Sequence, residues 1–147
     1  MNISGERQLS APVDKVWRGI HDVDVLRQTV PGCQELTQTA PDTYTGAASV
    51  GISVIKGLYR GTLRLLEERD DSFLRIAVSA KSGHAEIQGE GSLELEPKDG
   101  ATLLRYSGEA RIKGPLAAVG QRLLPSATRS LTEQFFDNLE QKMREID

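Results

Sequence analysis

The chain has 147 residues and a formal net charge of −3, and 38% of its residues are hydrophobic. This length suits one domain with its own core, so we expect residues 1–147 to form a single domain. The weak negative charge argues against broad electrostatic binding of nucleic acid. Only one cysteine is present, Cys33, which excludes an internal disulfide and fits a reducing cytosol. The first residues lack the basic and apolar regions of a signal peptide, so we expect a cytoplasmic protein.

The first thirty-two residues predict one strand and two short helices. Residues 3–9 alternate in polarity, which indicates a strand. Ser10 is then expected to cap a helix whose apolar residues recur at helical spacing through Ile20. A second helix is predicted over Val23–Thr29. Pro31 ends it, because proline cannot donate a helical hydrogen bond.

From Cys33 to Lys113 the polarity has a period of two, which predicts antiparallel strands joined by short turns. The strand over residues 85–96 is the clearest, with apolar residues and glycines on one face and polar residues on the other. The predicted strands are 34–39, 43–54, 57–68, 73–80, 85–96 and 102–113. The predicted turns are 40–42, 70–72, 81–83 and 97–100.

The last segment, from Gly114 onward, returns to helical spacing and carries one apolar stripe that extends to Ile146. Gly120 and Pro125 weaken a helix by about 1 and about 3 kcal/mol relative to alanine, so a kink is expected near Pro125. These elements together predict an α+β fold. Its curved antiparallel sheet of about seven strands grips a long C-terminal helix, with two short helices after the first strand.

Three segments carry a resemblance to a known family. They are Val30-Pro31-Gly32-Cys33, VGISVIKGLYRG at Val50–Gly61, and GPLAAVGQRLL at Gly114–Leu124 followed by Phe135-Phe136. Over nearly its whole length the sequence resembles the CoxG family of carbon monoxide dehydrogenase subunits, within the SRPBCC or START-like helix-grip superfamily.

The resemblance implies a non-catalytic accessory protein of a carbon monoxide dehydrogenase or a related molybdenum hydroxylase. It also implies a hydrophobic small molecule, quinone or lipid-like, held between the sheet and the C-terminal helix. Peripheral contact with the inner face of the cell membrane, through a partner enzyme, is implied as well. The long C-terminal extension of the family does not follow Asp147, so we do not expect this chain to anchor itself in a membrane.

The residues on the apolar, inward face of each predicted strand and helix are candidates for lining such a cavity. Glycines at the strand positions that face inward leave volume unfilled. Alternatively, they permit bulges and sharp curvature of the sheet. Each large apolar residue has core packing as its alternative role, and the Tyr106 hydroxyl is a candidate polar anchor. The candidate ligand-binding residues are Trp17, Ile20, Leu26, Val30, Leu63, Ile76, Val78, Ile87, Gly91, Leu93, Leu104, Tyr106, Gly108, Leu116, Val119, Gly120, Leu123 and Leu124.

Three lysines, Lys56, Lys81 and Lys113, each fall near a predicted strand end. One interpretation is a basic rim that meets anionic lipid or an acidic partner, and the alternative is ordinary solvated charge. The sequence does not decide whether the three share one edge.

The sequence lacks the common catalytic signatures. His21 and His84 are the only histidines, and neither belongs to a metal-ligand motif. No nucleophile elbow, phosphate-binding loop or dinucleotide fingerprint is present, so we expect no catalytic residue, metal or cofactor. Two alternatives remain open: an enzyme of the same fold, cyclase or hydrolase-like, that uses Tyr106 with Arg105 or His84, and a ligand-free adaptor.

Overall fold

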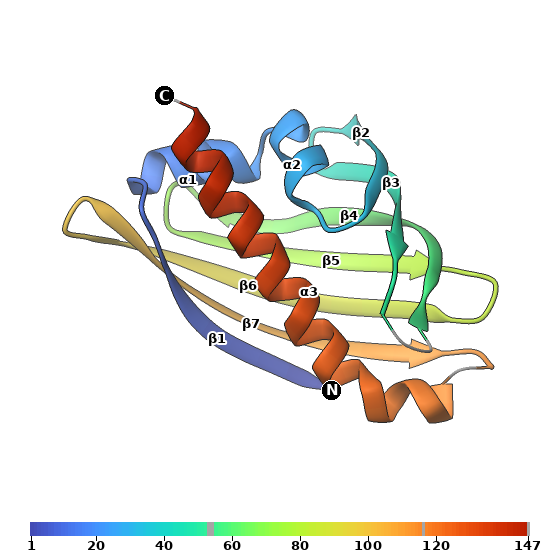
Figure 1. Ribbon diagram of the computed structural model, residues 1–147. Coiled ribbons are helices and arrows are strands. Elements are labelled where there is room, and N and C mark those ends of the chain that lie inside the picture. The colour runs from blue at the N-terminus through green and yellow to red at the C-terminus, as the bar shows by residue number, and fades with distance from the viewer. Residues whose placement is uncertain (53–54, 116, 147) are drawn as a thin grey trace.

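The computed structural model describes residues 1–52, 55–115 and 117–146, without the side chains of residues 119–121. In chain order the elements are β1 (Asn2–Leu9), α1 (Val13–Ile20), α2 (Val23–Thr29), β2 (Cys33–Ala40), β3 (Thr43–Val50), β4 (Gly57–Arg69), β5 (Phe73–Lys81), β6 (Glu86–Lys98), β7 (Ala101–Lys113) and α3 (Ala117–Glu145). A curved sheet faces the long helix α3, and the short helices α1 and α2 pack beside the C-terminal half of α3 (Figure 1). This is the predicted α+β architecture.

The seven strands form one antiparallel sheet in the order β1-β7-β6-β5-β4-β3-β2. Strands β2 to β7 follow one another as hairpins, as the short predicted turns require. Strand β1 joins the far edge of the sheet beside β7. The segment that contains α1 and α2 therefore carries the chain from one edge of the sheet to the other.

Two predicted strand ends are wrong. The strand predicted over residues 43–54 ends at Val50, and residues 53–54 lie outside the described part of the chain. The turn predicted at 97–100 is shorter, because β6 continues to Lys98 and only Asp99 and Gly100, with φ of +52° and +81°, form it. Pro97 fits β6 because it pairs with Thr102, beyond the point where β5 begins, so the sheet loses no hydrogen bond there.

The predicted cap of the first helix is also wrong. Pro12, not Ser10, occupies the N-cap position of α1, and no side chain caps that helix. The backbone N–H of Ser10 instead donates to the carboxylate of Glu140, 3.0 and 3.1 Å away, and so ties the end of β1 to α3. The second helix does have a side-chain cap, because the Asp22 carboxylate accepts a hydrogen bond from the N–H of Asp24 at 2.9 Å.

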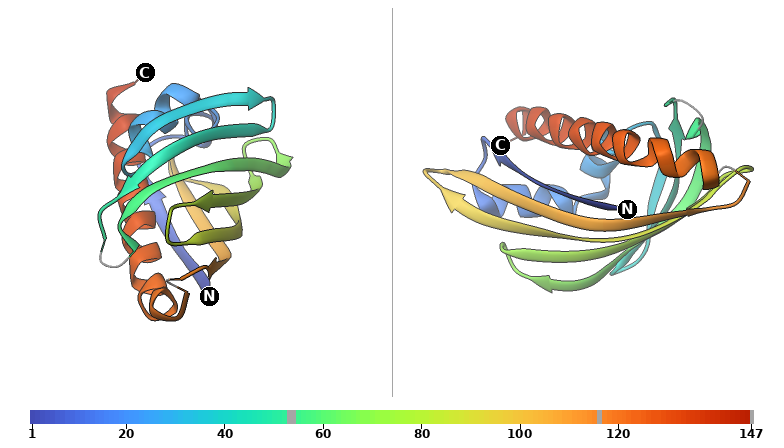
Figure 2. Two further views of the ribbon diagram at one scale, coloured as in Figure 1. Left: turned by 90° about the vertical axis from the view of Figure 1, so that its right-hand side faces the viewer. Right: turned by 90° about the horizontal axis from the view of Figure 1, so that it is seen from below.

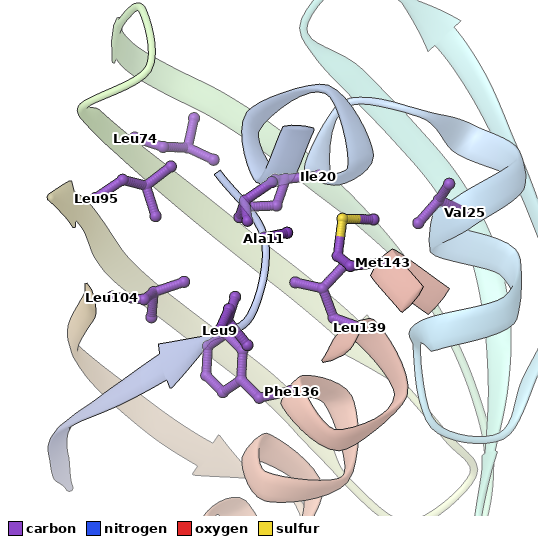
Figure 3. Packing of buried hydrophobic residues seen from close by; sticks show 11 residues of the cluster. Leu9, Ala11, Ile20, Val25, Leu74, Leu95, Leu104, Phe136, Leu139 and Met143 are labelled. Carbon is purple, nitrogen blue, oxygen red and sulfur yellow. The ribbon is translucent and has the colours of Figure 1, made fainter. Parts of the chain in front are cut away.

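The apolar side chains gather in two separate clusters. The main cluster joins the three helices to one end of the sheet (Figure 3) and contains Leu9, Ala11, Val16, Ile20, Val25, Leu74, Leu95, Leu104, Phe136, Leu139 and Met143. The small cluster joins the N-terminal part of α3 to the other end of the sheet and contains Tyr59, Ala85, Ile112 and Leu124. The two clusters therefore fasten α3 to the sheet at two places.

Helix α3 stays helical through Pro125 and bends there. Its residues form one continuous helix from Ala117 to Glu145, with the proline inside. Its first turns run in a different direction from the remainder (Figures 1 and 2). This change of direction confirms the predicted kink. Its cause is the proline, which removes one helical hydrogen bond and clashes with the preceding turn.

Residues of the main cluster should contribute more to the free energy of unfolding than exposed residues do. Leu139 has no exposed surface, so Leu139→Ala should lower the free energy of unfolding by about 2–5 kcal/mol in urea denaturation. The control Leu58→Ala removes a leucine that is 47% exposed and should change that free energy by no more than about 0.5 kcal/mol. Equal losses in the two variants would contradict this description of the core.

Candidate functional site

The candidate site is the concave surface of the sheet between the two clusters. Its residues face the helix side of the sheet, yet they are only half-buried and belong to neither cluster. We call this surface the open zone, and its residues are Leu63, Val78, Gly89, Gly91, Gly108 and Ala110. These inward residues therefore remain partly accessible, and none of them belongs to a cluster that the described side chains of α3 complete.

The glycines of the open zone lie where strands β6 and β7 approach closely. A β-carbon built on Gly91 would lie 3.0 Å from the carbonyl oxygen of Ser107, and one built on Gly108 would lie 3.0 Å from that of Glu90. Gly91 and Gly108 are directly opposite each other in the β6–β7 ladder. Glycine thus suits the close approach of these strands, where a β-carbon would be crowded. The three atoms nearest to each of these β-carbons belong to the sheet rather than to α3.

The position of α3 explains why the zone is open. Among the strands, α3 packs most closely against β1 and β7, at one edge of the sheet (Figure 2). An ion pair between Arg7 of β1 and Asp137 of α3, at 2.5 Å, adds to the apolar contacts along this edge. Leu63 and Val78 lie on β4 and β5, farther from the helix, and stay half-buried.

The structure separates the predicted ligand-binding residues into groups. Four of them are core rather than lining: Ile20 and Leu104 lie in the main cluster, Leu124 lies in the small cluster, and Leu26 is buried in α2. Such closed positions offer no free surface to a ligand. The predicted residues that do lie in the open zone are Leu63, Val78, Gly91 and Gly108.

The other predicted residues surround the zone or fall outside it. Half-buried side chains that border a cluster are Trp17, Ile76, Leu93, Tyr106 and Ile87, and two further half-buried residues are Val30 and Leu123. Leu116 lies outside the described residues, as do the side chain of Val119 and the surroundings of Gly120. The prediction for these three positions stays a prediction.

The ligand-binding prediction omits two half-buried apolar residues of α3. Leu131 and Phe135 are half-buried and lie on the helix face that carries the buried Leu124 and Ala127. Their spacing of seven and eleven residues from Leu124 was the available signal, because these positions share one helix face.

Two tyrosine hydroxyls near the margins of the concave face donate hydrogen bonds to backbone carbonyls. The Tyr59 hydroxyl donates to the carbonyl of Ile55 at 2.7 Å, inside the small cluster. The Tyr44 hydroxyl donates weakly to the carbonyl of His21 at 3.4 Å. Burial, together with the nearby carboxylates of Glu68 and Asp22, raises the pKa of Tyr44.

His21 gives no support to catalysis. His21 Nδ1 lies 2.8 Å from the carbonyl of Trp17, and its Nε2 contacts the Glu68 carboxylate. Both ring nitrogens therefore face oxygen atoms of the protein and neither is free for a substrate. In the part of the chain that the structure describes, no group of three or more histidine, cysteine or acidic side chains could hold a metal ion.

Two open depressions on the convex face are lined mostly by polar residues and glycine. One lies beside the Arg60–Glu35 ion pair, at 2.7 Å, and is lined largely by threonines. The other is lined by Gln88, Glu90 and Arg111, among others. Over the described ranges of the chain, none of the helices combines the length and apolarity needed to cross a membrane.

Comparison with known proteins matches this architecture. A conserved protein from Geobacillus kaustophilus is 27% identical, with a TM-score of 0.93 over 99% of this chain and 96% of that one. A START superfamily protein from Mycobacterium smegmatis is 12% identical, with a TM-score of 0.77 over 99% of each chain. A protein from Thermus thermophilus is 19% identical, with a TM-score of 0.76 over 99% of this chain and 98% of that one. The fold is therefore START-like, and the search of curated proteins found no match.

The family follows from the sequence itself. The model of CoxG, a family of carbon monoxide dehydrogenase subunits, matches residues 5–144. The chain belongs to this family, as the three segments named above predicted. The family is one of accessory subunits, which favours a role beside a carbon monoxide dehydrogenase rather than catalysis by this chain.

The glycine geometry gives a test. Gly91→Ala should lower the free energy of unfolding by about 1–3 kcal/mol, because its β-carbon would crowd the carbonyl of Ser107. Gly83→Ala is the matched control, since a β-carbon there has nothing within 4 Å, and its free energy should change by no more than about 0.5 kcal/mol. If Gly91→Ala leaves the free energy of unfolding unchanged, the strands can move apart without cost.

Proposed function

We propose that this chain is a non-catalytic accessory protein that carries a hydrophobic small molecule, quinone or lipid-like, for a carbon monoxide dehydrogenase or related molybdenum hydroxylase. The observation that supports this most is the half-burial of Leu63 and Val78 on a surface that faces α3. Hydrocarbon in the middle of a folded domain is normally covered. A bound apolar molecule would cover it here.

The physics of burial suits such a ligand. Removing apolar surface from water contributes about 25 cal/mol per Å², before the cost of association is subtracted. The sheet side of the open zone presents only hydrocarbon and glycine from its six residues. Binding would therefore rest on burial and shape rather than on charge, as for a quinone or lipid tail.

The same-fold enzyme is the alternative, and the described geometry disfavours it. Arg105 and Tyr106 are consecutive in β7, so their side chains point to opposite faces. Arg105 lies on the convex face, where it contacts Glu96 at 2.8 Å and Glu6 at 3.3 Å. His84 is exposed in the β5–β6 connection near the small cluster, whereas Tyr106 packs against the main cluster. The expected pairing of Tyr106 with either group is therefore not formed.

The lysines of the predicted rim support a peripheral contact. Strands β3, β5 and β7 end and strands β4 and β6 begin at the same end of the sheet (Figure 1), so Lys56, Lys81 and Lys113 lie toward that end. Lys81 of β5 and Lys113 of β7 are both paired with Glu86 of β6, the strand between them. The opposite turns carry Asp70, Asp71 and Asp99 instead. In the proposed function the basic end approaches the anionic inner face of the membrane, and the enzyme holds the protein there.

A substitution in the open zone tests the carrier role. Val78→Trp should fill the space above the sheet and lower the affinity for 2-methyl-1,4-naphthoquinone by about tenfold or more, a loss of about 1.4 kcal/mol. The matched control is Ala77→Trp, because Ala77 lines the polar depression on the convex face, and its affinity should stay within about twofold.

The measurement is native mass spectrometry of the freshly purified protein, with organic extraction of any bound molecule, followed by titration with the naphthoquinone. Retention of full affinity by Val78→Trp would contradict binding in the open zone. A wild-type protein that is isolated empty and takes up no naphthoquinone would favour the ligand-free adaptor.

The basic end makes a separate prediction. The triple variant Lys56→Gln, Lys81→Gln, Lys113→Gln should lose most of its binding to vesicles that contain anionic lipid, because each lysine near such a surface contributes about 1 kcal/mol. The control variant Arg64→Gln, Arg75→Gln, Lys98→Gln has the same net charge but changes exposed cations elsewhere. Co-sedimentation at low and high salt measures the difference. Equal binding by the two variants would assign any attraction to net charge alone.

A further inference from the structure

The two edge strands of the sheet, β1 and β2, differ in how their outer sides are protected. An unpaired strand edge presents backbone N–H and C=O groups that another strand can bind, and proteins commonly block such edges with bulges or covering elements. Strand β2 has both, because its pairing with β3 shifts at two places and α2 packs against it. The Arg27 side chain of α2 also donates to the carbonyl of Leu36 in β2 at 2.8 Å. Strand β1 pairs with β7 from Asn2 to Leu9 without a bulge, so its outer edge stays straight.

The outer side of β1 carries the backbone groups of its even-numbered residues. Met1 and Ala110 exchange two backbone hydrogen bonds, at 3.0 and 2.9 Å. Because bonded and non-bonded pairs alternate along an antiparallel ladder, the odd-numbered residues of β1 bond to β7 and the even-numbered ones point away from it. The N–H of Ser10 agrees with this alternation, since it donates to the Glu140 carboxylate of α3.

These outward groups are open to another chain. The even-numbered residues of β1 are all exposed, and in Figure 1 the strand forms the lower left border of the sheet, with α3 on its inner side. An inward-pointing charge can also block an edge, and β1 has one in Arg7. Its guanidinium pairs with Asp137 of α3 at 2.5 Å, so the charge is already compensated within the chain.

The sequence of β1 is complementary to a second copy of itself. If two copies pair antiparallel about a two-fold axis at Gly5, the outward groups of Ser4 meet those of Glu6, and those of Asn2 meet those of Gln8. Opposed side chains then lie on the same face, with hydroxyl beside carboxylate and amide beside amide. At the centre Gly5 faces Gly5, each covered on the helix side by the phenol of its own Tyr106.

The neighbouring alignments fit less well. An axis at Glu6 places two carboxylates opposite each other, which is unfavourable. It also brings in Ser10, whose N–H is already held by Glu140. An axis at Ser4 leaves the outward groups of Gln8 without a partner. The alignment centred on Gly5 therefore uses the most outward groups without opposing like charges.

We propose that β1 pairs antiparallel with β1 of a second copy of this chain, centred on Gly5. The two sheets then form one continuous sheet, with both α3 helices on the same side. This inference does not rest on the carrier function. Because the two strands run in opposite directions, the basic ends of the two copies point away from each other, and a flat membrane meets one copy of the pair.

Sedimentation velocity of the full chain tests the pairing. One pair of edge strands makes a small interface, so wild type should pass from monomer to dimer over about 0.01–1 mM. Ser4→Pro removes an outward N–H and places the proline ring at the edge, and it should weaken association by about tenfold or more. Ser4→Ala is the matched control, because it keeps the N–H, and its association should stay within about twofold.

A pair of charge variants tests the alignment and does not depend on proline. Ser4→Glu places a carboxylate opposite Glu6 of the second copy and should weaken association by about two- to tenfold, whereas Ser4→Lys should strengthen it by a similar factor. Opposite effects at one exposed position cannot come from a damaged strand. Thr37→Glu and Thr37→Lys, on the exposed face of β2, repeat the changes of net charge and should leave association within about twofold.

Amide hydrogen exchange locates the interface. The amides of Ser4, Glu6 and Gln8 should exchange fast in dilute protein and slowly in concentrated protein. Those of Gly5 and Arg7 bond to β7 and should be protected at both concentrations.

Three outcomes overturn the proposal. A wild-type chain that stays monomeric at about 1 mM shows that a second copy does not bind this edge, which is then left to a strand of another protein. A dimer that neither Ser4→Pro nor Ser4→Glu weakens has its interface elsewhere. If Ser4→Glu and Ser4→Lys change association in the same direction, the strands are not aligned about Gly5.

Discussion

One helix, α3, has to cover the concave face of a sheet of seven strands, and the rest of the structure depends on this mismatch. The helix packs along the β1 edge and is fastened at its two ends by separate apolar clusters. Between the clusters the sheet presents hydrocarbon and glycine that no described side chain of α3 closes off. The CoxG fold thus gains its candidate binding surface from the way the helix is placed, without a dedicated motif.

The bend at Pro125 belongs to the same arrangement. Leu139 and Met143 dock the C-terminal part of α3 in the main cluster, while Leu124 reaches the small cluster at the other end of the sheet. A straight helix would follow one direction, whereas the sheet beneath is curved. The proline changes the direction of the first turns where the helix passes from one cluster to the other (Figure 2). The residue that weakens the helix therefore suits the surface that the helix covers.

Alternation along the strands separates two kinds of chemistry. On the convex face, charged residues such as Arg105 form ion pairs in water, where each contributes little to stability. On the concave face, the next residue, Tyr106, lies among rings and glycines. Its ring lies over Gly5 of β1 and packs against the ring of Phe136, with 5.3 Å between the centroids.

The sequence by itself determined the order of the elements and the face to which each strand residue points, because a period of two is a local property of the chain. It did not determine which inward residues are core. Leu104 and Val78 follow the same pattern, yet one is fully buried in the main cluster and the other is half-buried in the open zone. What lies opposite a residue depends on where α3 rests, and α3 comes from the far end of the chain. Only the tertiary structure could decide this, since periodicity fixes the face of a side chain but not the neighbour that covers it.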